Sequence, residues 1–304
     1  MKSEILQQVQ TLKKRIGQLS REVESLKAVF SVEGSLTMRG LKIHRKNPTE
    51  GLFFPVTLSP VRQSRFYEMM KRYSFRLVLR DIIKNQDQFQ AGDLTHYCSL
   101  DTARDYCDFL CALKTIKKTK GSLYQTMGSS LCSFGPTLEW FIAEMFQRDF
   151  ASPALYGVSI KETLSGGDYD VIASWNRRLI YVEAKSSPPR GIEQNEITAF
   201  FSRVDELLPD VAILFNDTQL RMKDKLVVMF EEELKRRYGK KSRTDYPVNR
   251  LVEELFEVKN RIFIINSRKD IAENFAICLR HYLRSIISAS PQKSYEKRSH
   301  DRDT

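Results

Sequence analysis

The sequence GGDYDVIA, residues 166–173, is followed after a short turn by LIYVEAK, residues 179–185. Each stretch holds a run of apolar residues, which is typical of a buried strand. The residues Trp175-Asn176-Arg177 between them predict a tight turn. The two stretches are therefore expected to form a short hairpin inside an α/β domain.

Three charged residues, Asp170, Glu183 and Lys185, interrupt this otherwise apolar hairpin. Side chains alternate along a strand, so Tyr181, Glu183 and Lys185 share one face. Burying such charges costs several kcal/mol each unless they are paired or bind a metal. Two carboxylates can hold Mg²⁺, which lowers the pKa of an attacking water, and a lysine can stabilise charge that develops on a phosphate. Asp168, expected on the same strand face as Asp170, is an alternative ligand, and a salt-bridged strand pair without catalytic use is the alternative to a metal site.

An aspartate, a short hairpin, and Glu-Ala-Lys after an apolar strand together resemble the PD-(D/E)xK nuclease superfamily. The resemblance implies that Asp170 and Glu183 bind Mg²⁺ or Mn²⁺ and that Lys185 assists catalysis. It also implies a metal-binding glutamate on the preceding helix, for which Glu139 is the candidate and Glu144 the alternative. The sequence departs from the family pattern in having no proline before Asp170.

The resemblance covers roughly residues 135–215, in the order helix, three strands, helix and strand. The surrounding pattern predicts a nuclease domain at 128–288 with an α/β, restriction-endonuclease-like fold, in which a mixed sheet is flanked by helices. The expected helices are 137–150, 192–207 and 271–286, and the expected strands are 155–160, 169–173, 179–184, 211–215 and 261–266.

Residues 65–127 predict a second unit, because their pattern runs helix, short helix, helix and basic hairpin. The helices are expected at 65–84, near 94–97 and from about 100 onward. This order resembles winged-helix DNA-binding modules. A winged helix that contacts proteins, or a plain helical subdomain, is the alternative.

The resemblance to winged helices implies which residues contact DNA. In that family the third helix enters the major groove and the hairpin lies on the backbone. Thr102 and Arg104 are therefore candidates for the helix contact, and Lys117, Lys118 and Lys120 are candidates for phosphate contacts.

Residues 1–34 predict a coiled coil, because apolar residues recur at alternating spacings of four and three. Branched residues occupy one seam position and leucines the other, which favours two parallel strands and hence a homodimer. A single amphipathic helix packed on its own domain is the alternative. The seam residues are Ile5, Val9, Leu12, Ile16, Leu19, Val23, Leu26 and Phe30. Glycines and prolines predict an irregular linker at 35–64, and polar residues predict a disordered tail at 289–304.

The amino-acid composition indicates the kind of partner and the cellular compartment to expect. The chain has 49 Lys and Arg against 38 Asp and Glu, and its net charge of +11 favours polyanionic partners. No apolar run suggests a membrane span or signal peptide, and the 5 scattered cysteines suggest a reducing compartment, so a cytoplasmic protein is expected. We predict a Mg²⁺-dependent DNA endonuclease acting on duplex DNA. The alternatives are a non-catalytic winged-helix regulator and a nuclease for branched DNA or RNA.

Overall fold

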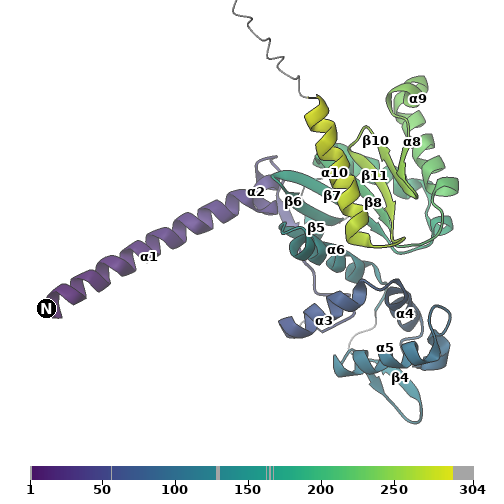
Figure 1. The fold of residues 1–304 in the computed structure, drawn as a ribbon, viewed down its shortest axis with the longest axis horizontal. Helices are drawn as coiled ribbons and strands as arrows, with labels where there is room; N and C mark the ends of the chain where they lie inside the picture. The colour runs from purple at the N-terminus through teal and green to yellow at the C-terminus, as the bar shows by residue number, and fades with distance from the viewer. Residues whose placement is uncertain are drawn as a thin grey trace, which may run out of the picture.

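The computed structural model describes residues 2–55, 57–127, 131–161, 163, 166 and 168–289. Figure 1 shows a long N-terminal helix, a small helical part with a hairpin, and a sheet with helices on both faces. No helix in these described ranges is long and apolar enough to cross a membrane.

An eight-stranded mixed sheet forms the centre of the larger part. The strands β5, β6 and β7 are antiparallel, β7, β8 and β11 are parallel, and β11, β10 and β9 are again antiparallel. All five predicted strands are present. In spatial order the strands are β1 (Ile43–Arg45), β5 (Ala154–Ile160), β6 (Tyr169–Trp175), β7 (Arg178–Lys185), β8 (Val211–Asn216), β11 (Ile262–Asn266), β10 (Leu255–Val258) and β9 (Asn249–Val252).

Helices cover both faces of this sheet, which confirms the predicted α/β fold class with a mixed sheet flanked by helices. The helices α6 (Gly135–Asp149) and α10 (Ile271–Ala289) pack on one face. On the other face lie α2 (Val32–Thr37), α7 (Gln194–Leu207) and α8 (Val228–Tyr238). Shorter helical turns are η2 (Pro189–Gly191), η3 (Lys223–Val227), η4 (Gly239–Lys241) and α9 (Ser242–Asp245).

The β6–β7 hairpin has the turn that its sequence predicts. Asn176 and Arg177 both have positive φ, at 48° and 61°. Two consecutive residues of this kind match the right-handed twist of the flanking strands. The register pairs Trp175 with Arg178 and Val171 with Val182. This pairing brings the start of β6 beside the end of β7. Of the glycine turn expected before β6, Gly167 lies outside the described residues.

The smaller part contains three helices and a three-stranded sheet of order β2-β4-β3. The single helix predicted at 65–84 is wrong, because the chain breaks at Lys71 and Arg72 into two helices. The Nη1 atom of Arg76 donates to the carbonyls of Met70 and Lys71, at 2.6 and 3.1 Å, and so satisfies the end of the first helix. The short helix expected near 94–97 is a 3-10 turn that ends at Leu94. The elements are α3 (Pro60–Met70), α4 (Tyr73–Lys84), β2 (Phe89–Gln90), η1 (Ala91–Leu94), α5 (Leu100–Ala112), β3 (Ile116–Lys118) and β4 (Leu123–Thr126).

The N-terminal segment is one helix, α1 (Lys2–Phe30), which projects from the sheet in Figure 1. Its predicted seam from Ile5 to Leu26 is 44 to 63% exposed, and the side chain of Phe30 lies outside the described residues. The predicted linker at 35–64 contains β1, which pairs with β5, and Phe53, whose amide donates to buried Thr137 at 2.9 Å. Residues 290–304 of the predicted tail lie outside the described residues.

Candidate active site

Glu183 stands at the centre of the candidate site. It lies near the end of β7 and is only 2% exposed. Arg203 of α7 donates to both of its carboxylate oxygens, at 3.0 and 2.9 Å, and the Tyr181 hydroxyl also donates to it. Burying a carboxylate costs several kcal/mol unless such donors are present to offset the lost water. The alternation of β7 therefore directs this acid toward α7, as its period of two predicts.

Lys185 joins the same group from two positions further along β7. Its Nζ lies 3.0 Å from Oε1 of Glu183 and 2.9 Å from Oε1 of Glu196 on α7. Burial alone would lower the pKa of Lys185, but these two carboxylates raise it above its ordinary value. The ammonium therefore stays charged at neutral pH.

Asp170 reaches the group from β6. Its Oδ2 accepts a hydrogen bond of 2.7 Å from the backbone N–H of Ala184, the residue between Glu183 and Lys185. Burial raises the pKa of Asp170 well above its ordinary value, and the charges of Glu183 and Glu139 raise it further. A single backbone donor does not offset the loss of water and the two neighbouring acids.

Glu139 comes from α6, on the opposite face of the sheet from α7. Its Oε2 would lie 3.7 Å from a Cβ placed on Gly157 of β5. Gly157 has a φ of +52°, and the same Cβ would meet Pro48 at 2.6 Å, so only glycine fits there. Burial raises the pKa of Glu139 to about 7, with further increases from Glu183 and then Asp168.

The four predicted site residues are thus gathered at one edge of the sheet, where β6 begins and β7 ends. Three carboxylates supply hard oxygen donors, which fit Mg²⁺ or Mn²⁺ in type. The raised pKa values of Asp170 and Glu139 come first from burial and then from neighbouring acids, and a divalent cation would offset the second of these causes. In the described part of the chain, however, no three His, Cys, Asp or Glu side chains converge closely enough to hold a metal ion as they stand. Glu183 would first have to release part of its contact with Arg203.

The comparisons with known proteins come from structure alone. Neither a protein-family model nor a curated protein matches the sequence. Protein VC1899 from Vibrio cholerae aligns with 84% of this chain at 13% identity, with a TM-score of 0.45. Can2 from Sulfobacillus thermosulfidooxidans, solved in complex with cyclic tetra-adenylate, aligns with 82% at 14% identity, also with a TM-score of 0.45. This chain spans 61% of the length of each of these two chains.

The alternative residues lie in other environments. Asp168 precedes β6 rather than sharing a strand face with Asp170, so that expectation is wrong, and it forms an exposed ion pair with Arg45. Glu144 pairs with Arg148 one turn along α6.

The sequence did not lead us to Arg203, the α7 residue whose guanidinium donates to both carboxylate oxygens of Glu183. A signal for it exists, because Glu196, Phe200 and Arg203 recur at i, i+4 and i+7 on one helical stripe. A charged pair on the stripe that holds a buried phenylalanine indicates a buried polar partner. Only the fold shows that this partner is Glu183.

The candidate DNA-contact residues lie apart from this site, on the smaller part. Lys117 and Lys118 on β3 and Lys120 in the following turn are exposed. On α5, Arg104 is exposed and pairs with Asp101 at 3.4 Å. The side chain of Thr102 is half-buried and bonds to Ser99, the residue that caps the helix. The lysines are therefore freer to meet a phosphate than the two helix residues are.

Proposed function

We propose that this protein is a metal-dependent nuclease of the PD-(D/E)xK type that hydrolyses phosphodiester bonds in DNA. The observation that carries the proposal is the meeting of Asp170, Glu139 and Glu183 with Lys185 at one sheet edge. Two of these acids are held at raised pKa. Strongly perturbed pKa values cluster at functional sites, where burial and like charges are brought together.

Each residue has a role that follows from its surroundings. Asp170, Glu183 and Glu139 would hold Mg²⁺ or Mn²⁺, which when bound polarises the phosphate and activates water. Lys185 stays protonated beside two carboxylates, so it serves as a fixed positive charge that stabilises the developing phosphate charge rather than as a base. Tyr181 orients Glu183 through its hydroxyl, and stacking of its ring on Phe200 holds it in place.

The smaller part is proposed to be a winged-helix module that binds duplex DNA. Support comes from the order α4, α5 and a β3–β4 hairpin, and from the exposed lysines on that hairpin. The exposed face of α5 also carries Asp101, Asp105 and Asp108. Carboxylates repel phosphates, so we assign backbone contact to the hairpin and restrict α5 to contacts within the groove.

Helix α1 is proposed to form a parallel coiled coil with α1 of a second copy. Its seam is apolar, strictly 3.5-periodic and exposed along its described length. A dimer would bring two candidate sites to one duplex, one for each strand.

Cleavage assays test the central proposal. Supercoiled plasmid and labelled duplexes are incubated with Mg²⁺, Mn²⁺ or EDTA. Glu183→Ala and Asp170→Asn should abolish cleavage, and Lys185→Ala should lose turnover while DNA binding persists. Asp168→Asn is the matched control, because it removes a nearby exposed carboxylate, and it should cut like the wild type. Wild-type cleavage by both Glu183→Ala and Lys185→Ala would refute the nuclease.

One observation favours a second function, a non-catalytic DNA-binding regulator. Glu183 is satisfied by Arg203, Lys185 and Tyr181, as a structural ion-pair network would be. In that case EDTA would leave duplex binding unchanged, and no metal or substrate would support cleavage.

A further inference from the structure

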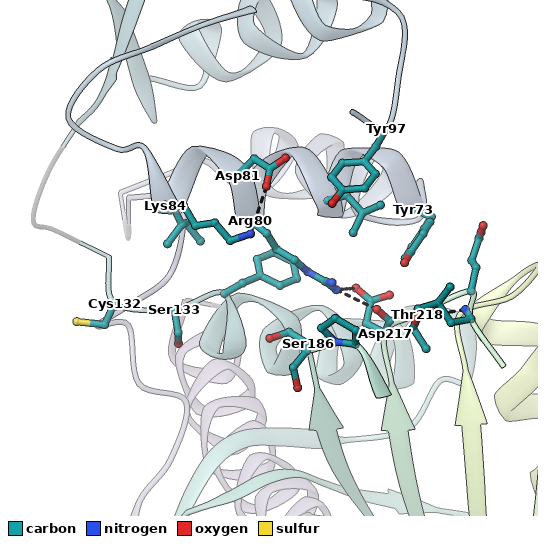
Figure 2. A pocket seen from close by; sticks show the side chains of 17 residues that line it. Tyr73, Arg80, Asp81, Lys84, Tyr97, Cys132, Ser133, Ser186, Asp217 and Thr218 are labelled. Atoms are coloured by element: carbon teal, nitrogen blue, oxygen red, sulfur yellow. Dashed lines mark hydrogen bonds and ion pairs between the residues drawn. The ribbon is translucent and has the colours of Figure 1, made fainter. Parts of the chain in front are cut away.

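A pocket of about 680 Å³ lies between α4 and the ends of strands β7 and β8. Figure 2 shows α4 on one side, with Ser133, Ser186 and Thr218 facing it from the other. This volume falls in the range of about 300 to 1,000 Å³ that is usual for small-ligand sites. The pocket therefore has room for a nucleotide-sized group but not for a duplex.

The pocket adjoins the candidate active site. Ser186, which lines it, directly follows Lys185 in the chain. Ser133, which also lines the pocket, lies near Glu139. A Cβ built on Gly135 would have the Ser133 hydroxyl at 3.5 Å and Oε1 of Glu139 at 3.7 Å. A strand whose phosphate lies at the candidate site would therefore pass the pocket opening with its next nucleotide.

Aromatic and apolar side chains make up much of the lining, which also contains the ion pairs Arg80–Asp217 and Lys84–Asp81. Tyr73 and Tyr97 both line the pocket (Figure 2), and Tyr97 is 49% exposed. The ring of Phe134 lies under the Arg80 guanidinium, whose carbon is 5.2 Å from the ring centroid. Lys84 is exposed and pairs with Asp81 at 3.5 Å. Aromatic faces suit a nucleobase, and the exposed Lys84 suits a phosphate beside it.

The inner wall of the pocket is rigid. Asp217, fully buried after β8, receives Nη2 of Arg76 at 2.9 Å and is also bonded by Arg80. These two arginines join α4 to the sheet, so the pocket keeps its shape between the two parts of the protein. Within the described residues, Nε of Arg80 is buried without a hydrogen-bond partner, which leaves a donor beside the pocket.

We propose that this pocket receives one unstacked base of the substrate strand, next to the phosphodiester at the candidate site. The inference rests on the proposed nuclease function and gives it a substrate class: nucleic acid with an unpaired nucleotide at or beside the cut. Stacking on Tyr97 supplies binding energy that a fully paired base cannot use. A perfect duplex would have to unpair a base first, at a cost of about a few kcal/mol.

Binding without cleavage tests the pocket directly. Fluorescence anisotropy in EDTA measures affinity for labelled single-stranded DNA, a duplex with one bulged nucleotide and a perfect duplex. Tyr97→Ala should weaken binding of the first two roughly tenfold and leave the perfect duplex nearly unchanged. Tyr97→Phe keeps the ring and should bind like the wild type. Lys84→Gln should also weaken binding, whereas Lys240→Gln, in the short turn η4 that follows α8, should not.

An abasic scan then locates the base. Removing the base at one position should lower the affinity of the wild type by about the same factor and should leave the affinity of Tyr97→Ala unchanged. An equal loss on all three DNAs, or an abasic cost that persists in Tyr97→Ala, overturns the pocket. The binding measurements need no metal. If the protein cleaves nothing, but its binding depends on the base, only the proposed nuclease function is wrong. If Tyr97→Ala cleaves a perfect duplex efficiently, only the proposed role of the pocket is wrong.

Discussion

Replacing Glu139 with glutamine should make the protein's stability less sensitive to pH. In the folded protein burial raises the pKa of this carboxyl from 4.5 to about 7. Between these values the folded chain keeps a proton that the unfolded chain has lost. Stability therefore falls as pH rises through this window. Glutamine carries no titrating proton, so Glu139→Gln removes this contribution.

The size of the effect follows from the shift. One pH unit corresponds to about 1.4 kcal/mol, so a rise of about 2.5 units corresponds to on the order of 3 kcal/mol. Wild-type protein should lose most of this, roughly 2.5 kcal/mol of its unfolding free energy, between pH 5 and pH 8 through Glu139 alone. The raised pKa of Asp170 acts in the same direction and remains in the variant. The pH slope of Glu139→Gln should therefore be smaller but not zero.

Urea unfolding in EDTA at pH 5 and pH 8 measures the difference. Trp140, buried beside Glu139 in α6, provides a fluorescence signal for unfolding. Glu144→Gln replaces another glutamate of the same helix and serves as the matched control, with a wild-type slope expected. If Glu139→Gln and wild type lose the same unfolding free energy between the two pH values, burial and the neighbouring acids do not raise the pKa of Glu139 in the folded protein.

Three further predictions test other parts of the chain. Replacing the three lysines of the β3–β4 hairpin with alanine should weaken duplex binding and reduce the slope of log affinity against log salt; an unchanged slope would remove the hairpin as a phosphate contact. Deleting residues 1–30 should convert a dimer into a monomer in light scattering, and equal monomeric masses before and after would discard the coil. Arg203→Met should lose about 3 kcal/mol of stability in EDTA, because Glu183 loses a buried partner, and Mg²⁺ should restore part of it. Denaturation with and without Mg²⁺ measures this, and an equal loss in both would argue against a metal at Glu183.

Much of the site was predictable because strand alternation is a local rule. The period of two along β7 placed Glu183 and Lys185 on one face, and the two-residue turn at Asn176 fixed the hairpin. Asp168 was harder, since its place depends on where β6 begins. A shift of one residue in the start of β6 decides whether Asp168 belongs to the strand. In the structure it lies just before the strand and pairs with Arg45.

Other features depend on contacts between segments far apart in the chain. The break between α3 and α4 follows from Arg76, which caps one helix and also binds Asp217, 141 residues later. Helical periodicity contains no information about such a partner. Similarly, β1 joins the large sheet although the segment around it, rich in glycine and proline, predicts only irregular structure. Long-range pairing, rather than local propensity, decides both.

The charges of the candidate site suggest why its acids are arranged unequally. Glu183, near the end of a buried strand, is paired with both Lys185 and Arg203. Burial and the neighbouring acids raise the pKa values of Asp170 and Glu139, and the opposing charges of Lys185 and, for Glu139, of Arg45 do not cancel this rise. A raised pKa favours the protonated carboxyl, and a divalent cation bound there would compete with that proton. These two half-buried carboxyls would then supply oxygen donors to a bound Mg²⁺.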